Sequence, residues 1–145
     1  MLPIPRLKGG HIAKAGLRRV FALLLKWGPA VAWMGVIFYI SSLPDTSIPI
    51  SGDEPLSIGA HLAEYAILGF LLLRAVTAPS GWLSHRWLGA LITLLCSFLY
   101  ALSDEWHQSF VPGRFSSPVD VMVDVIGAGL AILIALSLER LGHHY

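Results

Sequence analysis

Four long apolar runs constrain this chain more than any other feature. They occupy residues 27–43, 57–76, 87–101 and 119–138. A helix rises about 1.5 Å per residue, so runs of this length approach or reach the span of a roughly 30 Å hydrocarbon core. Only 13% of the 145 residues are charged, whereas 55% are hydrophobic, and a soluble domain of this size needs more charge on its surface. The sequence therefore predicts an all-α fold, a polytopic membrane protein with a four-helix bundle.

The flanks of the four runs divide the chain into three parts. Residues 1–26 carry six basic residues and no acid, and they are predicted to be a basic cytoplasmic N-terminal segment. Residues 27–138 are predicted to be the membrane domain, and residues 139–145 a short cytoplasmic tail. Pro29 near the start of the first run is interpreted as a first-turn residue, where a missing N–H group is tolerated. The single cysteine, Cys96, excludes an intramolecular disulfide.

The distribution of basic residues predicts the orientation in the membrane. Nine of the ten Lys and Arg residues lie in the N-terminal segment, around the loop at residues 77–86, or in the tail. Only Arg114 lies on the other side of the predicted bundle. Short cytoplasmic loops are enriched in Lys and Arg, so both termini are expected in the cytoplasm. Interfacial aromatic residues fit the same arrangement, with Trp27, Trp82 and Trp87 at one side and Tyr100 and Trp106 at the other.

A polar stretch at residues 103–124 separates the last two apolar runs, and a second polar set lies in the run at 57–76. A tight turn between two membrane helices does not need so many ionisable side chains. With the predicted orientation, both sets lie at the outer side of the bundle. The residues that we consider as a site are His61, Glu64, Tyr65, Asp104, Glu105, Gln108, Arg114, Asp120 and Asp124.

Helical spacing places these polar residues on shared faces. His61, Glu64 and Tyr65 are separated by three and four residues, so they project from one side of their helix. Two further series recur at intervals of three or four: Ser97, Ala101, Glu105 and Gln108, and Asp120, Asp124, Gly127 and Ala131. The first of these holds only if its helix continues past Ser103. The second leads from two acids into small residues that would allow another helix to approach closely. His107 points elsewhere and is assigned to the loop or the water interface.

Several interpretations of this polar set remain open. Ionisable groups in a membrane domain normally face the bundle and pair, so Arg114 is the natural counter-charge for Glu105 or Asp120. The set is then either a clasp between helices or a functional site. A divalent cation is possible at His61 and Glu64 with carboxylates from other helices, although no familiar ligand spacing is present. His61 with Glu105 or Asp104 suits general acid–base chemistry, whereas no serine lies in a nucleophile elbow. No nucleic-acid-binding patch or phosphate-binding glycine loop is present.

Three motifs resemble the VanZ-like family. They are H-L-A-E-Y-A-I-L-G at residues 61–69, S-D-E-W-H-Q-S-F-V-P-G-R at 103–114, and D-V-M-V-D-V-I-G-A at 120–128. The resemblance covers roughly residues 30–137, and the order and spacing of the motifs are specific. Residues matching the family's polar positions are His61, Tyr65, Glu105, Gln108, Arg114, Asp120 and Asp124. Many members carry Asp-Lys four and three residues before the histidine, where this chain has Ser57 and Ile58.

The resemblance implies a bacterial protein of the cytoplasmic membrane, related to proteins linked to teicoplanin resistance, without implying a reaction. We expect the polar site to bind or act on an envelope lipid or a lipid-linked cell-wall precursor. His61 and Glu105 are the candidate catalytic residues, and Arg114 is expected to hold an anionic head group. The candidate ligand-binding residues are Glu64, Tyr65, Asp104, Gln108, Arg114, Asp120 and Asp124. The alternatives are a non-catalytic accessory protein with a helix clasp and, less favoured, an ion path.

Overall fold

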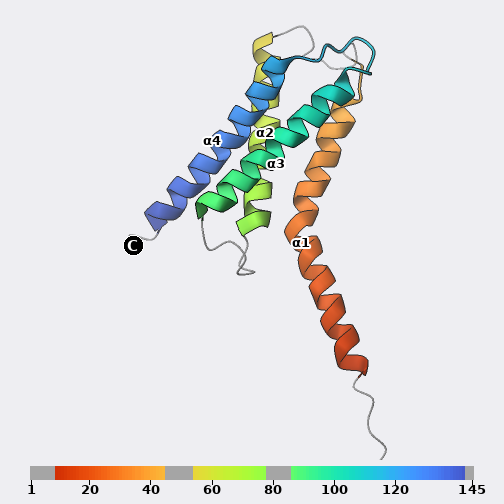
Figure 1. The fold of residues 1–145 in the computed structure, drawn as a ribbon, viewed down its shortest axis with the longest axis vertical. Coiled ribbons are helices and arrows are strands. Elements are labelled where there is room, and N and C mark those ends of the chain that lie inside the picture. Colours follow the sequence, from red (N-terminus) through yellow and green to blue (C-terminus); the bar gives the residue numbers. More distant parts are fainter. Residues whose placement is uncertain (1–8, 45–53, 78–85, 143–145) are drawn as a thin grey trace, which may run out of the picture.

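The computed structural model describes residues 9–44, 54–77 and 86–142, which form four α-helices (Figure 1). Their bounds are Gly9–Ser41 for α1, Glu54–Thr77 for α2, Arg86–Gln108 for α3 and Pro118–Gly142 for α4. Each is long and apolar enough to cross a membrane. The all-α, four-span prediction is therefore confirmed. The remaining parts of the predicted basic segment, the loops and the tail (residues 1–8, 45–53, 78–85 and 143–145) lie outside the described residues.

Helix α1 begins far earlier than the apolar run that predicted it. The expected membrane helix starts at Trp27, whereas α1 starts at Gly9 and contains 33 residues. At about 1.5 Å per residue, α1 is roughly 50 Å long and exceeds the hydrocarbon core. Its N-terminal half extends away from the other helices (Figure 1), and its side chains from Lys14 to Leu25 are exposed. The apolar run measures where a helix can enter lipid, but helix formation continues beyond that boundary.

The interpretation of Pro29 as a first-turn residue is wrong, because Pro29 lies inside α1. Proline has no N–H group, so the carbonyl of Leu25, four residues earlier, loses its partner within the helix. Arg74 in the last turn of α2 donates from Nη2 to this carbonyl oxygen at 3.2 Å. A side chain from the neighbouring helix thus replaces the hydrogen bond that the proline removes.

Helices α2 and α4 form the most extensive helix pair of the bundle. A Cβ atom on Gly127 would lie 2.5 Å from the carbonyl oxygen of Leu62, and one on Gly69 would lie 2.8 Å from the Cα atom of Ala128. Both contacts are with backbone, which cannot move aside as a flexible side chain can. Glycine therefore lets these backbones approach, as the small residues after Asp124 predicted.

Helices α2 and α3 both contact α1 and α4, while no contact joins α1 to α4 within the described residues. Two of the side-chain hydrogen bonds that attach α1 come from tryptophan and tyrosine side chains. The indole N–H of Trp33 donates to the carbonyl oxygen of Glu64 at 2.9 Å, and the hydroxyl of Tyr100 donates to that of Met34 at 2.6 Å. Most other large apolar side chains of the described helices face outward, as expected where the surrounding solvent is lipid.

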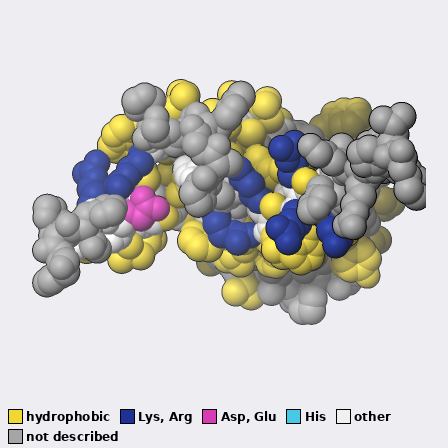
Figure 2. Space-filling view, turned by 90° about the horizontal axis from the view of Figure 1, so that it is seen from below, with side chains coloured by type: hydrophobic (Ala, Val, Ile, Leu, Met, Phe, Trp, Pro, Cys, Tyr) yellow, Lys and Arg dark blue, Asp and Glu magenta, His cyan; other side chains and the backbone are white. Residues whose placement is uncertain are grey.

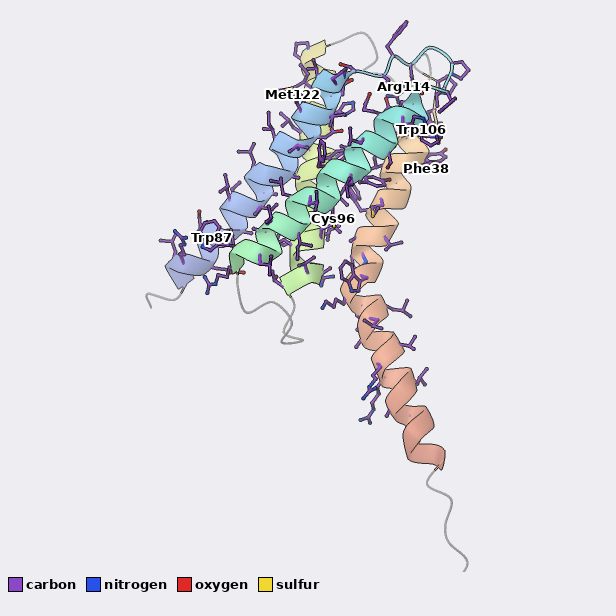
Figure 3. All side chains as sticks on the ribbon, in the orientation of Figure 1. Phe38, Trp87, Cys96, Trp106, Arg114 and Met122 are labelled. Atoms are coloured by element: carbon purple, nitrogen blue, oxygen red, sulfur yellow. The ribbon has the colours of Figure 1, made fainter. Side chains whose placement is uncertain are left out.

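The two ends of the bundle differ in charge. At the polar end, α1 and α3 finish and α2 and α4 begin. All described Lys and Arg residues except Arg114 lie toward the opposite, basic end, and Figure 2 shows them gathered there. Trp87 and Trp106 lie at opposite ends of α3 (Figure 3), and both are exposed. These positions match the interfacial level that tryptophan favours in membrane proteins.

Candidate functional site

The predicted polar residues lie at the polar end because of where each helix begins or ends. His61 is in the third turn of α2, and Glu64 and Tyr65 lie near the middle of that helix. Helix α3 continues to Gln108, as its periodic face required, so Asp104, Glu105 and Gln108 form its last turns and all three are buried. Asp120 and Asp124 are in the first turns of α4. Arg114 lies in the connection between α3 and α4, over the ends of α1 and α3 (Figure 3).

A buried pair joins α2 to α4. Nδ1 of His61 lies 3.0 Å from Oδ1 of Asp124, and the two side chains are 14% and 0% exposed. With Asp124 ionised, the ring N–H of His61 is the donor in this hydrogen bond. The sequence suggested Glu105 or Asp104 as the acid–base partner of His61. The structure instead brings Asp124 to the ring, a contact that fixes its orientation and tautomer.

Glu105 holds the start of α4 rather than a cation. Its Oε2 accepts a 2.7 Å hydrogen bond from the backbone N–H of Ser117. Ser117 precedes α4, and its hydroxyl oxygen in turn accepts from the N–H of Val119 at 3.1 Å, which is the geometry of an N-cap. A carboxylate at this position is favoured by the unpaired N–H groups and the positive end of the helix dipole. Glu105 therefore fixes the connection between α3 and α4 over the site.

Gln108 connects the ends of α3 and α1. Its Nε2 donates to Oδ2 of Asp104 at 3.1 Å and, at 3.4 Å, to Oγ of the buried Ser41 in α1. Its Oε1 accepts from Nη1 of Arg114 at 3.4 Å. One amide side chain thus lies between the carboxylate of Asp104 and the guanidinium of Arg114.

Arg114 caps α1, and the expected pairing with Glu105 or Asp120 is wrong. Its Nε donates to the carbonyl oxygen of Leu43 at 3.3 Å and its Nη2 to that of Ile40 at 3.1 Å. Ile40 is in the last turn of α1 and Leu43 lies two residues beyond it, at the negative end of the helix dipole. The Ile40 oxygen also accepts from the N–H of Leu43 at 3.1 Å. With the bond to Gln108, three of the five guanidinium N–H groups are used.

Several buried side-chain oxygen atoms, four of them in predicted site residues, have no hydrogen-bond partner among the described residues. Three belong to carboxyl groups that are at most 3% exposed, and the other two are fully buried hydroxyl oxygens. Leaving such a group unpaired costs about 1–3 kcal/mol. The atoms are Asp104 Oδ1, Glu105 Oε1, Asp124 Oδ2, Tyr65 Oη and Ser97 Oγ. Each of the three carboxyl groups uses one oxygen within the protein and leaves the other unpaired.

Two of the predicted site residues are less buried than most of the others and make no described hydrogen bond through their carboxyl groups. Glu64 and Asp120 are only half-buried, and no hydrogen bond to either carboxyl group occurs within the described part of the chain. In that same part, no three His, Cys, Asp or Glu side chains are placed to hold a metal ion. The geometry thus gives the sequence-based metal hypothesis no support, and we propose no cation at His61 and Glu64.

The end of α1 and the turn after it make contacts that the sequence did not predict. Ser41 bonds to Gln108, and Ser42 Oγ lies 3.0 Å from Nε2 of His107. The His107 ring also stacks on Phe38, with 4.3 Å between ring centroids. His107 is thus in the last turn of α3, half-buried against α1 rather than in the loop. No sequence motif marks these contacts, because a serine at a helix end is common and backbone carbonyls are the same for every residue.

Four membrane-length helices with buried ionisable side chains at one end define a multi-pass integral membrane protein. Within this class, residues 26–139 match the family described as VanZ/LLP1. The chain belongs to this family, which confirms the resemblance drawn from the motifs. No curated protein and no solved structure matches the chain significantly.

Proposed function

We propose that this protein binds an envelope lipid or a lipid-linked cell-wall precursor, whose head group lies among the polar residues at the polar end. The observation that carries this proposal is the set of unpartnered oxygens on Tyr65, Asp104, Glu105 and Asp124. They come from α2, α3 and α4, and all four side chains are buried. Unpaired acceptors at this depth are costly, and a bound polar group offsets that cost.

The polar end faces the outer leaflet of the bacterial cytoplasmic membrane in this proposal. The support is the concentration of Lys and Arg at the opposite end (Figure 2). Basic residues favour the cytoplasmic side, which places both termini there. A head group of the outer leaflet then reaches the site without crossing the membrane, and the family's link to teicoplanin resistance fits a ligand in the cell envelope.

Each site residue has a role in this proposal that follows from its contacts. Arg114 holds an anionic part of the head group with its two remaining N–H groups, because three are used by α1 and Gln108. His61 is the acid–base group, and Asp124 orients its ring. Glu105 keeps one carboxyl oxygen free for the ligand while the other holds Ser117.

Native mass spectrometry of the detergent-released protein tests the proposal. The wild type is expected to retain a phospholipid or polyprenyl-phosphate species, and Arg114→Ala is expected to retain much less. Arg86→Ala is the matched control, because Arg86 is exposed at the basic end and, among the described residues, forms an ion pair with Glu139 at 3.8 Å. Equal retention by Arg114→Ala and Arg86→Ala would show that Arg114 holds no head group. A wild type without bound lipid would refute lipid binding.

The second candidate is a non-catalytic accessory protein in which the polar residues only clasp the helices. The bonds of His61, Glu105, Gln108 and Arg114 favour it, since together they reach all four helices. Glu105→Gln separates the two candidates, because glutamine keeps an oxygen that can accept from Ser117. A clasp predicts that stability and function change together, so both stay close to the wild type where glutamine keeps the bond to Ser117. A binding site predicts lost lipid retention at unchanged or higher stability, as functional sites commonly trade stability for activity.

A further inference from the structure

The part of α1 from Lys14 to Leu25 is exposed along its whole length, and the proposed function does not use it. The first buried side chain described in α1 is that of Ala30, which is 1% exposed. Arg74, in the last turn of α2, donates to the carbonyl oxygen of Leu25. Leu25 therefore lies close to the level at which the bundle ends, and the residues before it extend beyond that level (Figure 1).

The segment is too long to be only an extension of the membrane span. From Lys14 to Ser41, α1 rises roughly 40 Å at about 1.5 Å per residue, whereas the hydrocarbon core is roughly 30 Å thick. Tilt alone would have to reach about 40° to bury this length, which is the upper end of the range for membrane helices. The first turns of the segment therefore lie outside the hydrocarbon core.

The side chains of the segment are sorted by chemistry around the helix. Four large apolar residues recur at i, i+3, i+4 and i+7 and are 53% to 72% exposed: Leu17, Val20, Phe21 and Leu24. At 3.6 residues per turn, these four share an arc of about 100°. The basic residues lie beside and opposite that arc: Lys14, Arg18 and Arg19. Leu23 and Leu25 lie outside the arc, in the turn next to the bundle.

An apolar face flanked by cations matches the surface of an anionic membrane. A helix of this kind lies in the interface, with its apolar face toward the acyl chains and its Lys and Arg residues on the head groups. Residues 14–25 contain no acid, so the charge of the whole segment favours an anionic partner. Two copies of the segment side by side would instead bring their cations together, which disfavours a second copy of this chain as the partner.

The bend in α1 provides the change of direction that such a position needs (Figure 1). Pro29 removes the helical hydrogen bond to the Leu25 carbonyl, and proline is the usual cause of a kink inside a helix. Arg74 donates to this carbonyl from outside the helix. The bend thus lies where α1 passes from the bundle to the exposed segment, and it lets the segment turn from the bundle axis toward the membrane plane.

We propose that residues 14–25 form an interfacial helix that binds the anionic lipid surface at the basic end of the bundle. Leu17, Val20, Phe21 and Leu24 face the boundary of the acyl chains. Lys14, Arg18 and Arg19 contact lipid phosphates. This surface is separate from the polar end, so its lipid contacts are independent of the head group in the proposed function.

A fluorescent label that reports the polarity of its surroundings tests the position of this helix. The full-length chain with Cys96→Ala is labelled at one introduced cysteine and reconstituted at one copy per nanodisc in phosphatidylcholine with phosphatidylglycerol. Labels at Leu17→Cys and Val20→Cys are expected to report an apolar environment. Matched labels at Ala15→Cys and Ala22→Cys, on the opposite side of the helix, are expected to report water or head groups.

The pattern of the four labels decides the geometry. Four labels in water would show that the segment projects from the membrane, and four labels in an apolar environment would show a longer, tilted span. Either result overturns the interfacial helix. Labels at Leu17→Cys and Val20→Cys that become apolar only when two copies share a nanodisc would also overturn it, because the second copy would then cover this face.

The contribution of charge is measured with Arg18→Gln in the Leu17→Cys protein. The ratio of membrane-bound to water-exposed label is expected to fall about fivefold, because a basic residue close to an anionic surface contributes roughly this factor. Arg86→Gln is the control, since Arg86 is an exposed cation at the same end but lies in α3. In nanodiscs of phosphatidylcholine alone, Arg18→Gln is expected to have no effect. Equal label burial in neutral and anionic nanodiscs would overturn the binding of anionic head groups.

Discussion

The contact between Arg74 and the Leu25 carbonyl predicts an energetic coupling between Arg74 and Pro29. Pro29 lacks the N–H group that would bond to this carbonyl within α1, and Arg74 Nη2 donates to it at 3.2 Å instead. Replacing Pro29 with alanine restores the helical donor. The Leu25 oxygen then accepts from the N–H of residue 29, and the guanidinium competes for it. Arg74 is therefore expected to contribute less to the free energy of unfolding in Pro29→Ala than in the wild type.

The magnitude follows from the hydrogen bond and its exposure. Hydrogen bonds to charged groups contribute about 1.5–3 kcal/mol where they are buried, and this one is exposed. We therefore expect Arg74→Ala to lower the free energy of unfolding by roughly 1 kcal/mol in the wild type. In the Pro29→Ala background, the loss is expected to be about half as large, which gives a coupling of roughly 0.5 kcal/mol or more.

The four proteins of this double-mutant cycle are compared by reversible unfolding in mixed detergent micelles. Arg86→Ala, combined with Pro29→Ala, is the control cycle, because Arg86 makes an exposed ion pair with Glu139 and no hydrogen bond to the described side chains and backbone of α1. In the control cycle, the effects of the two substitutions on the free energy of unfolding are expected to add. If Arg74→Ala lowers the free energy of unfolding as much in the Pro29→Ala background as in the wild type, the guanidinium does not replace the missing hydrogen bond of α1.

Two further predictions concern packing and the unpaired hydroxyl. Gly127→Ala places a Cβ atom 2.5 Å from the Leu62 carbonyl oxygen, so α2 and α4 must separate, at a cost of about 1–3 kcal/mol in unfolding free energy. Gly129→Ala, whose nearest neighbour would be at 3.9 Å, is expected to be neutral, and equal losses in the two variants would refute the close-contact argument. Tyr65→Phe removes an unpartnered buried hydroxyl and is expected to raise the stability of the lipid-free protein by roughly 1 kcal/mol while reducing lipid retention. A destabilised Tyr65→Phe would mean that this hydroxyl is already bonded.

The sequence predicted the parts of this structure that depend on side-chain pattern. Apolar length located the four helices, and intervals of three and four placed Tyr65, Glu105 and Asp124 on inward faces, where all three are buried. The approach of α2 to Gly127 also followed from small residues at helical spacing. Each of these features is determined by which side chains lipid tolerates and which ones it does not.

The features that the sequence did not predict are those in which backbone atoms are the partners. Arg114 looked like the counter-charge of an acid because charges are visible in a sequence, whereas the carbonyls of Ile40 and Leu43 are not. Glu105 likewise bonds to a backbone N–H at the start of α4. Helix ends expose such groups whatever their side chains are, and they compete effectively for charged partners.

The different environments of the two oxygens in each buried carboxyl group argue against a simple clasp. Asp104, Glu105 and Asp124 each use one oxygen to hold Gln108, Ser117 and His61 respectively, and each leaves the other buried and unpaired. A residue needed only to join helices could be an amide or a hydroxyl, which burial penalises less than a charge. Natural proteins pair nearly all of their buried polar groups, so three carboxyl groups that each leave one oxygen unpaired require an explanation. The bound polar group that we propose explains why the protein keeps carboxyl groups at these three positions and why it fixes each of them with only one of its oxygens.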